Sequence, residues 1–132
     1  CSAGERGATR LPRHNYPLNG GKGSAYEGGI REPMIVSWPG IVKNGSKCDK
    51  PLIIEDFFPG ILEIAGVEQY ETVQPVDGRS FVPLLTASGN PSDDRAFIWN
   101  FPNRWGNEGT GIGSTCTIRK GDWKMVYYYE TG

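Results

Sequence analysis

The sequence predicts an α/β fold that is rich in loops, and three observations lead to this prediction. The apolar run "MIVSW" at 34–38 is typical of a strand buried on both faces. The segment "IEDFFPGILEIAGV" at 54–67 spaces its apolar residues as a helix does. The segment at 114–129 has the pattern of an antiparallel hairpin. The 19 Gly and 10 Pro among 132 residues predict long loops between these elements.

The first half of the chain is predicted to hold a loop, a strand and a helix. Residues 1–25 show neither strand nor helix periodicity and are predicted to be loop. In the helix after the 34–38 strand, Asp56 is placed to cap the first turn, and Gly66 is a natural stop. One stripe of this helix is apolar and consists of Phe58, Ile61, Leu62 and Ala65.

The second half is predicted to be mainly strands and turns. "DGRSFVPLL" at 77–85 predicts a turn that leads into a short helical or irregular segment. "RAFIWNF" at 95–101 has the aromatic and β-branched content of a strand, which we expect to be isolated. In the hairpin, the turn falls at 120–122, and one face is formed by Trp123, Met125 and Tyr127.

The predicted elements do not form a complete sheet. A strand that is apolar on both faces needs neighbours to pair its backbone and cover its side chains, and no similar strand stands near 34–38. We therefore expect the neighbouring strands to precede this segment in a longer protein. We also expect the segment by itself to be poorly stable.

Charge and composition exclude several classes of protein. A formal net charge of -1 argues against a general nucleic-acid or membrane-surface binder, because such proteins need a net basic face. The sequence has no apolar run long enough to span a membrane. The three cysteines stand far apart and outside any zinc-site spacing, so no metal is predicted. Three buried thiols are favoured, and one disulfide with a spare thiol is the alternative: Cys1, Cys48 and Cys116.

The stretch "PLNGGKGSAYEGGIREP" at 17–33 places five glycines around one lysine. A phosphate-binding P-loop would need Gly at position 16 and Ser or Thr at position 23, but these are Tyr16 and Gly23. The dinucleotide pattern G-x-G-x-x-G, started at Gly21, would need Gly where Tyr26 stands. Gly21 and Gly23 let the backbone take positive φ, so the ammonium of Lys22 can point inward at an oxyanion. A solvated lysine in a surface loop remains the alternative.

These residues resemble a known family. "NYPLNGGKGSAYEGGIREPMIVSWPG" is similar to the motif N-x-P-L-x-G-G-K-G-x-x-Y-E-G-G-I-R-x-P-x-I-V-x-W-P-G of the formylglycine-dependent sulfatases, in the alkaline phosphatase superfamily. "EDFFPGILEIAGV", "DGRSFVPLL" and "IRKGDWKMVYYYETG" resemble later segments of the family in the same order, so the likeness covers about 15–132. It implies that Lys22 contacts the sulfate. Three residues are expected to shape the loop: Gly28, Gly29 and Arg31.

The resemblance implies a C-terminal portion of a sulfatase. Residues 1–76 would end the catalytic α/β domain, with the last strand and one helix of its large sheet, and 77–132 would form a small antiparallel subdomain. The family's calcium and formylglycine are expected in the parent enzyme, from upstream sequence, because the calcium-binding Asp pairs and the C/S-x-P-S-R motif are missing here. This segment alone is expected to be inactive. The family implies a periplasmic, extracellular or lysosomal location, and as partners a sulfated small molecule or glycan and the N-terminal part of the same protein.

Further residues are candidates for substrate contacts. His14, eight residues before Lys22, has the chemistry of a proton donor to a leaving alkoxide, although a plain loop histidine is favoured. "WNFPNRW" at 99–105 joins aromatic rings to amide groups, which suits a sugar and its hydroxyls. The specificity candidates in it are Asn100, Asn103 and Arg104.

Two other functions stay open at this point. A lysine in a glycine loop does not distinguish sulfate from phosphate, so a phosphoryl-transfer member of the same superfamily is one alternative. A noncatalytic carbohydrate-binding module that uses the aromatic strand at 95–101 is the other.

Overall fold

The computed structural model describes residues 15–89, 94–103 and 109–131. These residues belong to two compact units, each described here by itself. We call the first the sheet unit; its described residues are 15–34, 96–103 and 109–131. We call the second the helical unit; its described residues are 35–89 and 94–95. The described residues up to 34 belong to the same unit as the C-terminal hairpin, and the domain boundary expected at residue 76 stays a prediction.

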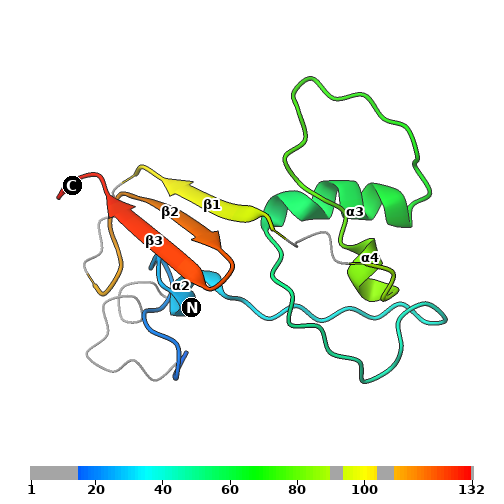
Figure 1. Cartoon of the computed structure of the whole chain (residues 1–132), viewed down its shortest axis with the longest axis horizontal. Helices are drawn as coiled ribbons and strands as arrows, with labels where there is room; N and C mark the ends of the chain where they lie inside the picture. The colour runs from blue at the N-terminus through cyan, green and yellow to red at the C-terminus, as the bar shows by residue number, and fades with distance from the viewer. Residues whose placement is uncertain (1–14, 90–93, 104–108, 132) are drawn as a thin grey trace. The chain divides into compact units, whose positions relative to one another are not determined.

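The sheet unit contains a three-stranded antiparallel sheet in the order β1-β2-β3 (Figure 1). The strands are β1 (Ala96–Phe101), β2 (Thr115–Lys120) and β3 (Trp123–Tyr128). The predicted hairpin is confirmed as β2 and β3, and its turn places Gly121 at a φ of +57°. The prediction of a strand at β1 is also confirmed. That this strand is isolated is wrong, because β1 pairs with β2 along its whole length.

The two faces of this sheet differ in burial. On the covered face, Phe97 is 4% exposed and its ring stacks with Trp99 at a centroid distance of 6.2 Å. On the open face, Trp123, Met125 and Tyr127 alternate along β3, as predicted, and all three are exposed. The short helix α2 (Glu27–Ile30) meets the covered face, where Glu27 contacts β3.

The strand expected at 34–38 is absent, and this prediction is wrong. Residues 31–38 form neither helix nor strand, and the Ile35 side chain is 96% exposed. A strand requires a partner for its backbone hydrogen bonds. Among the described residues, the three strands pair only with one another, so this apolar run has no ladder to join.

The helical unit is built around one helix. The turn η1 (Ile54–Asp56) leads into α3 (Phe57–Ile64), which confirms a helix here, and Gly66 ends it with a φ of +74°. A second short helix, α4 (Val82–Leu85), confirms the short helical segment expected after residue 77.

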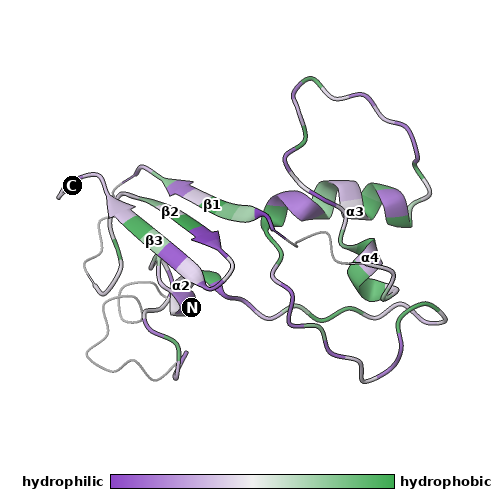
Figure 2. Cartoon of the chain, in the orientation of Figure 1, coloured by the Kyte–Doolittle hydropathy of each residue, from purple (hydrophilic) through white to green (hydrophobic). Residues whose placement is uncertain are grey.

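The packed face of α3 is not the predicted apolar stripe. The Phe81 ring lies against Gly60 and 5.4 Å from the ring of Phe57, so these residues form the contact. The predicted stripe is largely exposed, with Phe58 at 48% and Ile61 at 56% (Figure 2 shows the hydropathy of these elements). Apolar spacing indicated a helix correctly, but it did not indicate which side meets a neighbour.

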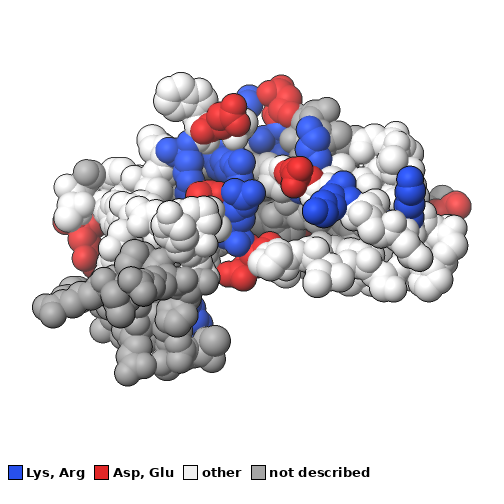
Figure 3. Space-filling view, turned by 90° about the horizontal axis from the view of Figure 1, so that it is seen from below, with Lys and Arg blue, Asp and Glu red and all other residues white. Residues whose placement is uncertain are grey.

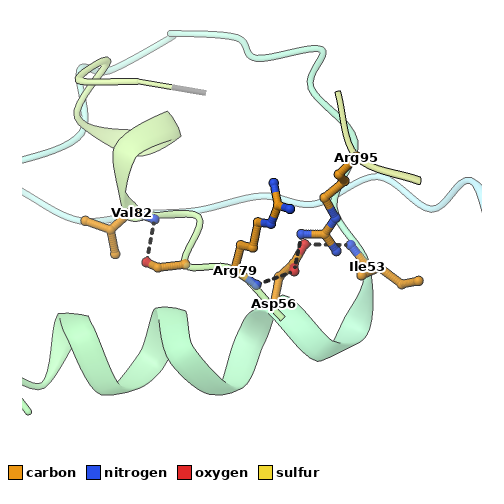
Figure 4. Close-up of polar contacts among 6 residues, drawn as sticks. Ile53, Asp56, Arg79, Val82 and Arg95 are labelled. Carbon is orange, nitrogen blue, oxygen red and sulfur yellow. Dashed lines mark hydrogen bonds and ion pairs between the residues drawn. The ribbon is translucent and has the colours of Figure 1, made fainter. Parts of the chain in front are cut away.

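Asp56 holds the helical unit together in a way that capping alone did not predict. Its side chain makes no capping bond to α3 and is fully buried. Its Oδ2 accepts the Ile53 backbone N–H at 3.0 Å, and its Oδ1 accepts the Arg79 backbone N–H at 2.9 Å. Arg95 Nη1 lies 2.8 Å from the same Oδ1 (Figure 4). One carboxylate thus joins three separate segments.

The described core is small. Among the described residues, the buried hydrophobic side chains are those of Ala25, Phe81 and Phe97. Hydrophobic burial is the main favourable contribution to folding, and the poor stability expected of the segment alone stays a prediction. None of the described helices is long and apolar enough to cross a lipid bilayer.

Candidate functional site

The glycine–lysine loop, residues 20–24, carries the principal candidate. The expected positive φ beside Lys22 is confirmed at Gly23, where φ is +85°, and a second one occurs at Gly20 rather than at Gly21. The lysine lies between them and is exposed at the surface of the described residues. The loop therefore projects a cation from a backbone that only glycine adopts readily.

Ser24 and Ala25 hold the glycine–lysine loop to the connection before β2. Ser24 is 3% exposed, and its Oγ donates to the Thr110 carbonyl at 2.8 Å and accepts the Tyr26 N–H at 3.1 Å. The next residue, Ala25, donates its backbone N–H to the Gly111 carbonyl at 2.8 Å. The buried Ser24 hydroxyl thus both donates and accepts a hydrogen bond.

The expectation that Gly28 and Gly29 shape the loop agrees with the packing around them. A Cβ at Gly28 would meet the carbonyl oxygen of Asn19 at 2.6 Å, and one at Gly29 would meet that of Gly21 at 2.6 Å. Gly28 also donates its N–H to Asn19 at 2.7 Å. Larger residues at either position would force the lysine loop away from α2.

Glu27 connects α2 to the hairpin by an ion pair that sequence reasoning missed. Its Oε1 lies 2.9 Å from Lys124 Nζ, and its Oε2 lies 3.8 Å from Arg119 Nη1. The Lys124 ammonium is also 5.9 Å from the centre of the Trp99 ring, a cation–π distance. Burial alone would raise the pKa of Glu27, but the hydrogen bond and charge of Lys124, with Arg119 and Arg31, lower it on balance.

We expect the Glu27 carboxyl to titrate below its ordinary pKa of 4.5. Because the folded pKa is depressed, the stability that this ion pair contributes is present above pH 4.5 and is lost as pH falls through the lowered pKa. Carboxyl-carbon NMR of selectively labelled Glu would measure this, with exposed Glu32 as the internal comparison. Lys124→Met should raise the Glu27 pKa, and no change would contradict the assignment.

A hollow and two tyrosines lie beside the ion pair. The hollow has a volume of about 320 Å³ and is lined by Pro17, Leu18, Asn19, Tyr26, Glu27 and Lys124. Tyr128, on the same face of β3, has its pKa raised to about 12 by burial and by a hydrogen bond with Tyr26. Tyr26 therefore meets the sheet immediately before Glu27 does.

The predicted substrate residues lie apart from this loop or outside the described residues. Asn100 is on the open face of β1, where its Oδ1 accepts a hydrogen bond from the Tyr129 hydroxyl at 2.9 Å. That face is opposite the one that Glu27 contacts, so the sheet stands between Asn100 and α2. Asn103 is exposed after the end of β1. His14 and Arg104 fall outside the described residues.

Calcium and formylglycine are expected from upstream sequence, and both stay predictions for the parent protein. In the described ranges, no three His, Cys, Asp or Glu side chains come together as a metal site would require. No cysteine of the sequence stands in C/S-x-P-S-R. Cys48 and Cys116 are free thiols, but the prediction that they are buried is wrong, because Cys48 is exposed and Cys116 is half-buried. Cys1 lies outside the described residues. Basic and acidic side chains are interspersed on the face shown in Figure 3.

The chain is similar to a family of sulphohydrolases and to several sulfatases. The family model described as "N-sulphoglucosamine sulphohydrolase, C-terminal" matches residues 21–132. Human steryl-sulfatase is 38% identical over 93 residues, which are 70% of this chain and 16% of that protein. A sulfatase of Formosa agariphila is 35% identical over 101 residues, 74% of this chain and 18% of that protein. Mouse steryl-sulfatase is 31% identical over 131 residues, 95% of this chain and 19% of that protein.

The chain thus spans less than a fifth of the length of these curated relatives. The matched region contains the glycine–lysine loop from Gly21 onward, α2, the helical unit and all three strands. The chain therefore belongs to the family of sulfatase C-terminal domains that this family model describes.

Proposed function

We propose that the protein containing this chain hydrolyses sulfate esters and that Lys22 contacts the sulfate group. Membership of a sulfatase family supports the reaction class. The observation that carries the role of Lys22 is its place on an anchored loop: Ser24 and Ala25 hold the chain beside it to residues 110–111. The anchored backbone fixes the point from which the Lys22 side chain extends, and its ammonium is a compact positive charge.

The proposed reaction breaks the bond between sulfur and the ester oxygen. A sulfate ester and water yield an alcohol and hydrogen sulfate, so the atoms and the charge balance. Negative charge is spread over the sulfate oxygens and the leaving oxygen in the transition state, and Lys22 stabilises it from one side. A preformed charge is effective because it does not need to reorient during the reaction. The nucleophile and any metal are proposed to come from other parts of the protein.

The proposed substrate is a sulfated carbohydrate. The family description names N-sulphoglucosamine, which supports the sugar but carries its sulfate on nitrogen and not in an ester. Asn103 and Arg104 are proposed contacts to sugar hydroxyls, and His14 is a proposed substrate contact. Asn100 lies on the face of the sheet opposite α2, so it is not proposed to share one substrate with Lys22. The names of two relatives refer to steryl sulfates, so a steryl sulfate is the competing substrate. The family also supports a periplasmic, extracellular or lysosomal location and association with an N-terminal part of the same protein.

The test is an assay of the full-length protein that contains this chain, with aryl sulfate and aryl phosphate as matched probes. We expect sulfate release to exceed phosphate release by several orders of magnitude in kcat/KM. The reverse preference would favour phosphoryl transfer. Sugar binding with no hydrolysis of either ester would favour the carbohydrate-binding module. A sulfated monosaccharide compared with a steryl sulfate would then identify the substrate class.

A further inference from the structure

We infer that Lys124 is a positioning residue: its ion pair with Glu27 holds the glycine–lysine loop so that Lys22 meets the sulfate. This inference rests on the proposed function, because it concerns the same lysine. It extends that function to the C-terminal hairpin, which no motif connects with the reaction. Lys124 is not itself proposed to touch the substrate.

The glycine–lysine loop has little freedom to move relative to α2 and the sheet. Ser24, two positions after Lys22, is hydrogen-bonded to the Thr110 carbonyl. Glu27, three positions after Ser24, forms an ion pair with Lys124 of β3. Gly28 and Gly29 leave no room for a Cβ against the carbonyls of residues 19 and 21. A shift of Glu27 away from the sheet is therefore passed along a tightly packed turn to the lysine.

The lysine end of the ion pair is held by the sheet. Lys124 is the second residue of β3, is paired across the ladder with Arg119, and has its ammonium near the Trp99 ring. The sheet thus presents a cation at a defined place. Glu27 is drawn to that place by two basic groups, at 2.9 Å and 3.8 Å.

The ion pair of Glu27 with Lys124 contributes little to global stability. The side chains of Lys124 and Glu27 are 17% and 32% exposed, and they border the open hollow described above. Ion pairs with this access to water typically stabilise a fold only slightly. A large effect of Lys124 on catalysis with a small effect on melting is thus the signature of positioning.

The experiment uses the full-length protein and an aryl sulfate. Lys124→Met, which removes the charge but keeps an aliphatic side chain of similar length, is expected to lower kcat about tenfold, since small misplacements of a reacting group are costly. The Tm should change by less than about 3 °C. Lys124→Arg should recover most of the activity, because it keeps the charge. Glu27→Gln should lower kcat to a similar extent and serves as the second variant if Lys124→Met fails to fold.

A double-mutant cycle tests whether Lys124 acts through Lys22. In a Lys22→Ala background, Lys124→Met should cause almost no further loss, because the group it positions is gone. If the two losses multiply instead, the inference is overturned. It is also overturned if Lys124→Met and Glu27→Gln behave like Lys47→Met and Glu32→Gln, which remove exposed charges elsewhere. A wild-type protein without sulfatase activity would refute the proposed function itself, a distinct outcome.

Discussion

Lys22→Ala in the full-length protein is expected to lower kcat on a sulfate ester by about 10²-fold or more. The expectation follows from the difference between the two states of the substrate. Charge on the sulfate oxygens and the leaving oxygen is greatest in the transition state, so a fixed cation stabilises that state more than the bound substrate. The loss should therefore appear mainly in kcat, with a smaller change in KM.

Comparison variants make this result specific. Lys22→Arg keeps the positive charge but replaces a compact ammonium by a planar fork, so it should recover activity only partly. Lys47→Ala removes an exposed lysine of the helical unit and should leave kcat unchanged. Steady-state kinetics on an aryl sulfate would measure all three variants. Near wild-type turnover in Lys22→Ala would remove this residue from the mechanism.

Features set by neighbouring residues could be predicted from the sequence. The stop of α3 at Gly66 and the hairpin turn at Gly121 each depend on one glycine with positive φ and on its immediate neighbours. The glycine–lysine loop could be predicted in part: positive φ was expected at Gly21 and Gly23, and it occurs at Gly20 and Gly23. With two adjacent glycines, the order of residues does not decide which of them takes positive φ.

Features that depend on distant partners could not be predicted. The pairing of β1 with β2 and the ion pair of Glu27 with Lys124 join residues far apart in the chain, and no spacing rule connects them. The apolar runs at 34–38 and along α3 had the same limitation. Ile35 and Ile61 signal burial by their side chains, yet both are exposed among the described residues. Hydropathy indicates that a side chain favours burial, but it does not predict which residue would cover it.

Asp56 could be predicted only in part, and its replacement is expected to have the second large effect. The sequence places an aspartate before a helix, which predicts a cap, but the three groups it binds come from positions 53, 79 and 95. Asp56→Ala would leave two backbone N–H groups and a guanidinium without this acceptor. Removing one partner of a buried ion pair typically costs about 3–5 kcal/mol. We expect a loss of that size in the helical unit.

Hydrogen exchange of the full-length protein would measure this loss where it occurs. The Ile53 and Arg79 amides donate directly to the carboxylate, so their protection should fall by about 10²-fold or more in Asp56→Ala. Asp49→Ala, which changes an exposed aspartate of the same unit, should leave both amides protected. Asp56→Asn keeps the side-chain volume and one carbonyl acceptor but loses the charge facing Arg95, so it should fall between the two. Equal protection in Asp56→Ala and Asp49→Ala would mean that the carboxylate does not hold these segments together, because each amide would then have another acceptor of similar strength.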